Sequence, residues 1–320
     1  TFWYKQNPDG RGCTLLSSDF AGGELTLPVS INGVTVCDVG CGCFDGAGVT
    51  GELVIPAGYD RIGVNAFAHN AITSISFPDS MQSLNSLSFG YCDKLTSVEL
   101  PKNLSGIYGN PFGVTYSLEN IGCSAENKWF KSVNGVIYSA DGASLVCASS
   151  ARSDESFTVA DGTREILWQA VYGAKGITNV ELNDGLENIY GEAFMGCTLY
   201  SVRVPYSVQF IGAGAFGWDI GWKWNSAFGV YGGAVAEAYA KQYGFAYNSM
   251  GDSSDDSSYD FGFKSNDTLT WNSVAGATQY NLNVTVEGGT SYVKVEQDAQ
   301  ADQYYRNNDG VIQTGKHTIL

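Results

Sequence analysis

The chain has 320 residues, of which 44% are hydrophobic, so it is long enough for one large or two ordinary folded domains. Asp and Glu number 33 against 17 Lys and Arg, which gives a formal net charge of -16. A surface this acidic repels nucleic acid backbones and anionic lipid headgroups, which excludes both as expected partners. No apolar run approaches the roughly 18 residues that a membrane-spanning helix needs, so no membrane insertion is expected. The chain begins TFWYKQ, without an initiator Met or a signal peptide, and we expect a soluble fragment of a longer protein.

A repeated pattern occupies residues 51–248, and residues 1–50 are predicted to form an N-terminal capping segment with a first, irregular repeat. The copies are 22 or 23 residues apart, except for one long gap before the fourth copy. Position zero of the six copies is taken at Pro56, Pro78, Pro101, Ala160, Asn183 and Pro205. Positions -3, -1, +6 and +11 are apolar in every copy. The +11 column consists of Phe67, Phe89, Phe112, Val171, Phe194 and Phe216.

The spacing of these columns predicts the fold. Apolar residues at -3 and -1 lie on one face of a short strand, because strand side chains alternate between faces. One such strand cannot bury its face alone, so stacked copies are expected to form a parallel sheet over a continuous core. We expect the +11 residues to fill that core from the opposite wall. A period in the low twenties with this alternation predicts a leucine-rich-repeat solenoid.

The pattern hydrophobic-x-hydrophobic-P followed by I-G-x-x-A-F-x-x-C resembles the BspA-like leucine-rich repeats of bacterial cell-surface proteins. The resemblance implies an extracellular protein, at the cell surface or secreted, with a non-catalytic role in adhesion. The resemblance also extends to the segments that open and close the array. Residues 13–44, CTLLSSDFAGGELTLPVSINGVTVCDVGCGCF, resemble the segment that opens such arrays, with Phe44 as the first residue of the +11 column.

Two further segments are expected within residues 51–248. The gap contains NKWFKSVNGVIYSADGASLVCASS, which resembles a β-hairpin insertion of the family and is predicted near 121–156; its Asn-Gly and Asp-Gly pairs favour tight turns. The segment AVAEAYAKQYGFAYNSM resembles the closing cap of such arrays. It predicts a cap helix near 233–243, which stops at Gly244 and has apolar positions at Val235, Ala238, Tyr239 and Tyr243.

The C-terminal part departs from the repeat. Residues 249–260 include GDSSDDSSYD, whose composition predicts a flexible acidic linker. A calcium-binding loop is the alternative, although the Gly and terminal Glu of such loops are missing. Residues 261–320 contain LTWNSVAGATQYNLNVTV, which resembles strands B and C of a fibronectin type III domain, with Trp271 and Tyr280 as core aromatics. Because a complete domain needs about 90–100 residues, we expect a partial, all-β segment.

The sequence offers no catalytic constellation. Its two histidines, His69 and His317, lie in different predicted domains, whereas a nucleophilic triad needs a histidine beside its nucleophile. His69 is expected in an exposed loop. Every acidic residue that can be aligned with the repeat falls in a column expected to face solvent. We therefore predict a protein that is not an enzyme and that uses no cofactor.

The eight cysteines are also judged by their columns. The cluster CDVGCGC lacks the four ligands and paired spacing of a zinc site, so no metal is expected. Cys43, Cys92 and Cys197 fall in columns of small residues and are expected to be unpaired, buried thiols. Cys37 falls in a column of polar residues and is expected to be more exposed. If a disulfide exists, Cys37 with Cys13 is the pair to test.

Two surfaces remain as candidate binding sites. Positions -2 and -4 point away from the core and form an extended outer ladder of the kind that solenoids use for partners, although it could equally be a solvated sheet face. The candidate ligand face on this ladder is Ser76, Glu99, Ser156, Thr158, Asn179, Glu181, Ser201 and Arg203. An insertion at 217–229 carries a candidate aromatic patch, formed by Trp218, Trp222 and Trp224.

These surfaces lead to two functional hypotheses. In the first, a monomeric protein presents its ladder to a protein or glycan ligand on a host or neighbouring cell. In the alternative, the chain is a carbohydrate-binding module whose tryptophans stack on sugar rings. Those tryptophans could instead hold the cap helix in place.

Overall fold

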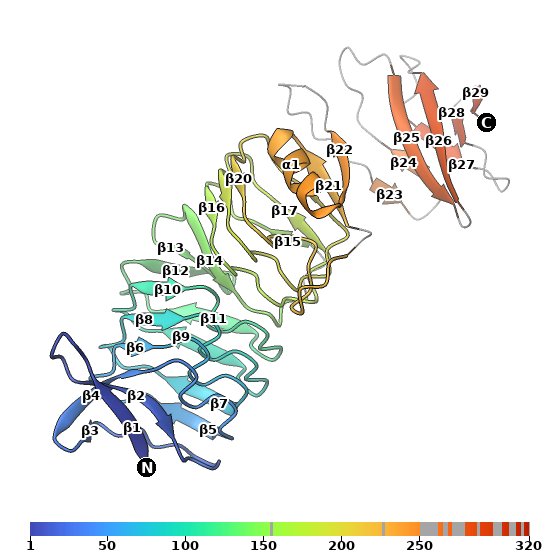
Figure 1. Ribbon diagram of the computed structural model, residues 1–320. Helices are drawn as coiled ribbons and strands as arrows, with labels where there is room; N and C mark the ends of the chain where they lie inside the picture. The colour runs from blue at the N-terminus through green and yellow to red at the C-terminus, as the bar shows by residue number, and fades with distance from the viewer. Residues whose placement is uncertain are drawn as a thin grey trace. The chain divides into compact units, whose positions relative to one another are not determined.

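The structure is a computed structural model that describes residues 1–153, 156–225 and 228–249, together with the backbone of seven strands between residues 262 and 319. The chain divides into two compact units, residues 1–251 and residues 252–320, and each is described by itself. The first unit is the predicted solenoid, with one strand of each turn on either side of a common core (Figure 1).

The predicted ladder forms the first wall of the solenoid. It is not one continuous sheet: its strands pair in parallel as β5–β7, β9–β11, β15–β17 and β19–β21–β22, with breaks between these groups. At two breaks the core is less well covered, since Phe77 at the end of β7 and Leu182 at the end of β17 are only half-buried. The strands are β5 (Thr50–Val54), β7 (Ala71–Ser76), β9 (Ser97–Leu100), β11 (Asn120–Cys123), β15 (Ser156–Thr158), β17 (Asn179–Glu181), β19 (Ser201–Arg203), β21 (Gly229–Gly232) and β22 (Ala246–Ser249).

A second wall is built from short strands around the +6 column, and its pairing is more continuous. One sheet follows the order β1-β2-β4-β6-β8-β10, with β3 on β4, and the next follows β12-β13-β14-β16-β18-β20. The strands of the first sheet are β1 (Phe2–Gln6), β2 (Cys13–Ser18), β3 (Ser30–Ile31), β4 (Val34–Val39), β6 (Arg61–Ile62), β8 (Ser83–Asn85) and β10 (Gly106–Tyr108). Those of the second are β12 (Phe130–Val133), β13 (Val136–Ser139), β14 (Ser144–Ala148), β16 (Glu165–Ile166), β18 (Asn188–Ile189) and β20 (Phe210–Ile211).

The +11 column lies between the two walls, as the repeat predicts. Its rings stack from turn to turn, with centroids 5.1, 5.4 and 5.9 Å apart in the first half of the array and 5.1 Å apart in the second. Burial of such large rings in every layer is a main source of the stability of this unit. All members of the column are fully buried: Phe44, Phe67, Phe89, Phe112, Val171, Phe194 and Phe216.

The long gap in the repeat contains a turn of its own. Strands β12 and β13 form an antiparallel hairpin, and β14 returns to pair in parallel with β16 in the second wall. Ala148 then takes the +11 position: its N–H donates to the carbonyl of Ala170 at 2.7 Å, just as Phe67 donates to Ser88 at 2.8 Å. Small Ala148 interrupts the aromatic column, and the buried core divides into two clusters near this point.

Both ends of the array are covered. At the start, the β1–β2 hairpin places Phe2 edge-on to Phe44, with centroids 6.3 Å apart. At the end, helix α1 (Ala234–Tyr243) stops at Gly244, whose φ of 72° suits glycine. Its buried residues are Ala236, Tyr239 and Ala240, whereas Ala238, one of the apolar positions of the sequence pattern, is exposed.

The second unit is described only through its strands, all antiparallel. A five-stranded sheet has the order β23-β24-β27-β28-β29, and β25 and β26 form a separate hairpin. The expected linker at 250–260 and Trp271 lie outside the described residues, and the fibronectin-like assignment stays a prediction. The strands are β23 (Gly262–Lys264), β24 (Thr268–Thr270), β25 (Gln279–Val286), β26 (Gly289–Glu296), β27 (Gln303–Arg306), β28 (Ile312–Thr314) and β29 (His317–Ile319).

Candidate binding surfaces

The ladder face presents its candidate residues to solvent because the neighbouring strand positions point into the core. All of them are exposed except Ser201, which is half-buried. The breaks between sheets divide them into groups. Ser76 lies on β7 and Glu99 on β9, two strands that do not pair, and Ser201 and Arg203 lie on β19, across the break from β17.

The structure brings four candidate residues into one hydrogen-bonded cluster on β15 and β17. Ser156 donates to one carboxylate oxygen of Glu181 and Thr158 to the other, both at 3.0 Å. Asn179 Nδ2 donates to the Ser156 hydroxyl at 3.1 Å. These contacts hold the carboxylate in one orientation while its remaining lone pairs face solvent. The cluster therefore presents one ordered, exposed carboxylate on this face of the ladder.

Nearer the first repeats, the break between β7 and β9 opens a cavity of about 390 Å³ on the ladder. Ser76 and Glu99 line it together with apolar Phe77 and Leu100. The cavity explains why Phe77 is only half-buried, since no hydrogen-bonded neighbour closes over it. Ser76 and Glu99 thus share a surface, but one separate from the Glu181 cluster.

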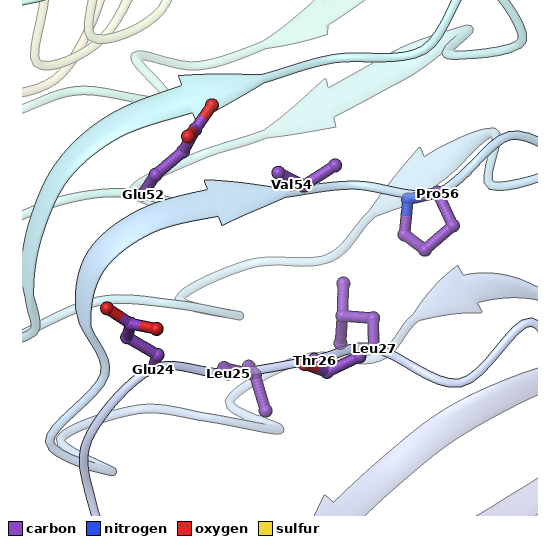
Figure 2. Close-up of a pocket in the computed structure, with 7 residues that line it drawn as sticks. All are labelled: Glu24, Leu25, Thr26, Leu27, Glu52, Val54 and Pro56. Carbon is purple, nitrogen blue, oxygen red and sulfur yellow. The ribbon is translucent and has the colours of Figure 1, made fainter.

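A second cavity, of about 380 Å³, lies beside β5 at the start of the ladder (Figure 2). It lies between β5 and the segment at residues 24–27, which pairs with the array at a bridge between Gly23 and Val49 and packs Leu25 and Leu27 into the core. Figure 2 shows Glu24 and Glu52 on the two neighbouring segments, at the same end of the cavity. Within the described part of the chain, no group of three or more His, Cys, Asp or Glu side chains is placed to hold a metal ion.

The tryptophans of the insertion have different roles in the structure. Trp218 is half-buried and packs edge-on against Tyr243 and Phe245 of the cap, with centroids 5.6 and 6.4 Å away. These contacts favour the interpretation in which a tryptophan of the insertion packs against the cap. Trp222 and Trp224 are 51% and 50% exposed, so about half of each indole meets solvent.

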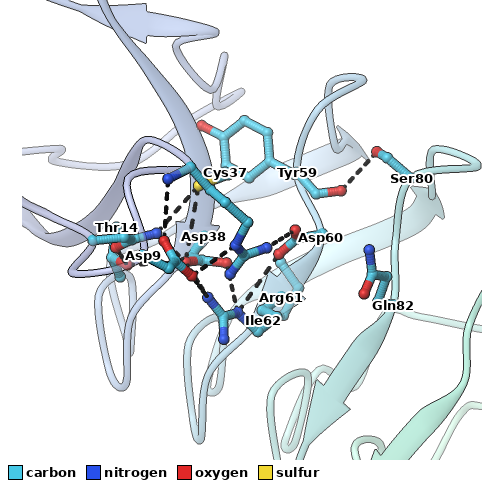
Figure 3. A network of polar contacts seen from close by, with 12 residues as sticks. Asp9, Thr14, Cys37, Asp38, Tyr59, Asp60, Arg61, Ile62, Ser80 and Gln82 are labelled. Carbon is cyan, nitrogen blue, oxygen red and sulfur yellow. Dashed lines mark hydrogen bonds and ion pairs between the residues drawn. The ribbon is translucent and has the colours of Figure 1, made fainter.

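A partly buried polar network joins the N-terminal hairpin to the first turns of the array, and the sequence did not reveal it (Figure 3). Arg61 donates to both carboxylate oxygens of Asp38, at 3.0 and 3.1 Å. Arg11, from the turn between β1 and β2, pairs with Asp60. Asp38 and Asp60 are both buried, so the expectation that the acidic residues of the repeat face solvent was wrong at Asp60. The N-terminal hairpin lies over the column of the repeat that contains Asp60. In the sequence, the only indication that this carboxylate is paired was the neighbouring Arg61.

The two buried carboxyls have opposite pKa shifts. Burial, together with the hydrogen bond to Asp38, raises the pKa of Asp60 to about 6. Burial also acts against ionisation of Asp38, but hydrogen bonds from Arg61 and from Asn7 outweigh it, and the pKa of Asp38 lies below its ordinary value. Asp38 is therefore the carboxylate that carries the charge in this network, and Asp60 is the one that titrates near neutrality.

The cysteines are all free thiols. Cys43 and Cys92 are buried and Cys197 is half-buried. Cys37 is only 4% exposed, so the prediction of an exposed Cys37 was wrong: the N-terminal hairpin covers it, and Asn7 Nδ2 lies 3.2 Å from its sulfur. It forms no disulfide with Cys13 and instead points its thiol to the Cys13 carbonyl, at 3.6 Å.

His69 is exposed, as predicted, but it has partners that the sequence did not indicate. Its Nδ1 lies 2.8 Å from a carboxylate oxygen of Asp45, and its ring stacks on Tyr91 with centroids 4.2 Å apart. No nucleophilic side chain belongs to these contacts. The histidine therefore takes part in a surface stack between adjacent turns.

The two walls, the aromatic column and the closing cap define a leucine-rich-repeat solenoid. The family described as the BspA type Leucine rich repeat region matches six copies in residues 22–133 and 148–219, and the chain belongs to that family. The match is interrupted over 134–147, where β13 and most of β14 of the inserted turn lie. Within the described residues, no helix is long and apolar enough to span a membrane.

Solved structures with a similar fold come from several bacteria. The pneumococcal vaccine antigen PcpA is 17% identical, with a TM-score of 0.48 over 78% of this chain and 82% of its own. A leucine-rich cell surface protein from Faecalibacterium prausnitzii is 14% identical, with a TM-score of 0.47 over 79% and 94%. A leucine-rich-repeat protein of T. pallidum is 18% identical, with a TM-score of 0.40 over 77% and 95%. Among curated proteins, none matches the sequence.

Proposed function

We propose that the chain is a non-catalytic binding protein of a bacterial cell surface, and that a protein partner docks on the ladder near Glu181. The observation that carries the proposal is the cluster in which Ser156, Thr158 and Asn179 orient one exposed carboxylate. A sheet face that served only for solubility would gain nothing from fixing this side chain. Membership of the BspA type family supports an extracellular setting.

The short side chains around the cluster favour close approach. Ser156, Thr158 and Asn179 leave a low surface on which another backbone can lie, and Arg203 adds an exposed cation on β19. A partner with both donor and acceptor groups would match this arrangement. Rigidity of the solenoid lowers the entropy that such docking costs, because the side chains are already ordered.

The proposal is tested by screening the full chain against arrayed host proteins and then changing the ladder. The variants are then measured with the host protein that the chain binds most tightly. Ser156→Arg together with Asn179→Arg should abolish this binding, because the two long side chains would occupy the surface on which the partner lies. Glu181→Gln keeps the shape and removes the charge, and should weaken binding about tenfold, the effect of losing one charge-assisted hydrogen bond. Ser105→Arg, at an exposed position outside the ladder, is the matched control. Unchanged binding by both ladder variants would refute the assignment.

A second candidate function, carbohydrate binding at the insertion, is favoured by the half-exposed indoles of Trp222 and Trp224. Flat aromatic rings with one free face suit the apolar face of a sugar ring. Trp224→Ala should then abolish binding to a glycan array while leaving protein binding at the ladder intact. Loss of both activities, or of neither, would contradict two separate sites.

A further inference from the structure

Four aromatic side chains are exposed along the second wall, away from the ladder and outside the insertion at 217–229. Tyr108 is 59% exposed, Trp168 42%, Tyr190 36% and Phe210 47%. We call these four residues the aromatic strip. Water-exposed aromatic surface that recurs over several turns is unusual for a face without a partner, because burying such rings is strongly favourable.

The residues of the strip come from distant parts of the sequence and are brought near one another by neighbouring strands. Strands β16, β18 and β20 are hydrogen-bonded neighbours, and Tyr190 lies beside Phe210 with ring centroids 5.9 Å apart. Trp168, which follows β16, reaches back to the end of β10: its Cζ3 atom is 2.8 Å from where a Cβ on Gly109 would lie. Tyr108 is the residue before Gly109, so the strip includes residues on both sides of the inserted turn, whose strands β12, β13 and β14 lie between β10 and β16 (Figure 1).

Glycines beneath the rings let them lie against the backbone. A Cβ on Gly106 would be 2.9 Å from Cε2 of Tyr108, so a side chain there would displace the ring. Gly109 has the same relation to Trp168, and its φ of +80° also favours glycine. The rings of Tyr108 and Trp168 therefore lie close against the backbone of the wall, and all four rings of the strip are partly exposed to solvent. The aromatic strip is therefore an open surface on which a ligand could lie, and not an enclosed pocket.

Two carboxylates and one amide lie beside the strip, and all three can accept hydrogen bonds. Glu165 and Asn188 are half-buried on β16 and β18, and Glu192 is half-buried just beyond. The Glu192 carboxylate accepts one hydrogen bond from Gln169 Nε2, at 2.8 Å, and keeps lone pairs for more. Hydroxyl groups are the donors that suit such acceptors. Anionic ligands are disfavoured by these carboxylates and by the net charge of -16.

We infer that the aromatic strip binds a neutral polysaccharide that lies along the second wall. A sugar ring has an apolar face of C–H groups, which stacks on a flat aromatic platform, and a rim of hydroxyl groups, which donate to Glu165, Glu192 and Asn188. The site goes beyond the ladder proposed above and stands independently of it. It is also distinct from the insertion, because its rings lie on β10, β16, β18 and β20 or directly after them.

The test uses the full chain on an array of neutral and anionic bacterial and host glycans, with affinities of bound glycans measured by titration calorimetry. Trp168→Ala and Tyr190→Ala should each weaken binding of a neutral polysaccharide about tenfold or more, as loss of a central stacking residue does. Trp3→Ala, at a 51% exposed tryptophan on β1, is the matched control and should bind normally. Circular dichroism checks that the variants remain folded.

The binding of the variants to glycans shows whether the aromatic strip is a polysaccharide site. Loss of neutral-glycan binding in the Trp168 and Tyr190 variants, with binding kept by Trp224→Ala, supports the strip. Binding lost only with Trp224→Ala overturns the strip and leaves the insertion as the glycan site. Preference for anionic glycans, or no binding to the array, also overturns it, and neither result bears on protein docking at Glu181.

Discussion

Replacing Phe67 by Ala tests whether the aromatic column carries the stability of the solenoid. Phe67 is fully buried, and its ring stacks between Phe44 and Phe89 with centroids 5.1 and 5.4 Å away. Truncating a buried Phe to Ala costs about 3–5 kcal/mol through lost burial and the cavity that remains.

The expected loss lies in the upper part of that range. Two stacking contacts disappear, and each such contact contributes about 0.5–1.5 kcal/mol beyond burial. The cavity cannot collapse easily, because backbone hydrogen bonds on either side fix the spacing of the turns: Phe67 N–H donates to Ser88 and Phe44 N–H to Ala66, both at 2.8 Å. We therefore expect the free energy of unfolding to fall by about 4–5 kcal/mol.

Urea titration followed by circular dichroism measures this change, with the slope of the transition as a check that the same surface unfolds. Phe210→Ala is the matched control: the residue is also a phenylalanine of the solenoid, but it is 47% exposed and should cost about 1 kcal/mol or less. If Phe67→Ala destabilised the protein no more than Phe210→Ala, the column would not be the packed core that the structure describes.

Three further predictions concern thiols, pH and the cap. In the native protein at pH 8, only exposed Cys41 should react quickly with a thiol reagent. Buried Cys92, whose pKa is raised to about 11, should react only on unfolding, and rapid reaction of a second thiol in the native protein would contradict this. Because the pKa of Asp60 is raised on folding, the native state binds the extra proton, and the stability of the wild type relative to Asp60→Asn should fall as pH rises from about 4 to 6. The pKa of Asp38 is instead lowered on folding, so the stability of the wild type relative to Asp38→Asn should fall as pH decreases through the acid range. Urea titrations at several pH values measure both stability differences, and the network would be refuted if the two differences changed with pH in the same direction. Trp218→Ala should lower the melting temperature by loosening the cap, and an unchanged value would show that its contacts are dispensable.

The sequence by itself determined the solenoid, because each turn repeats one local requirement. A Phe at +11 and an alternating apolar pair at -3 and -1 recur every 22 or 23 residues, and stacking is the only way for every copy to bury them. The spacing therefore predicted the buried positions of Phe67, Phe89 and Phe194. It also predicted which side of each ladder strand faces solvent, since that follows from alternation alone.

Only the tertiary structure decided how neighbouring turns meet and what covers the ends. Strands β7 and β9 of the ladder do not pair, although the repeat pattern that places Ser76 and Glu99 in the same column continues from one strand to the next. Hydrogen bonding between two turns depends on the distance between their backbones, and the pattern does not encode that distance. Cys37 and Asp60 belong to a polar column, yet they are buried, because a hairpin from outside the repeat lies over them. The aromatic strip likewise joins Tyr108 to Trp168 across 60 residues of sequence, and only folding of the inserted turn brings such distant residues together.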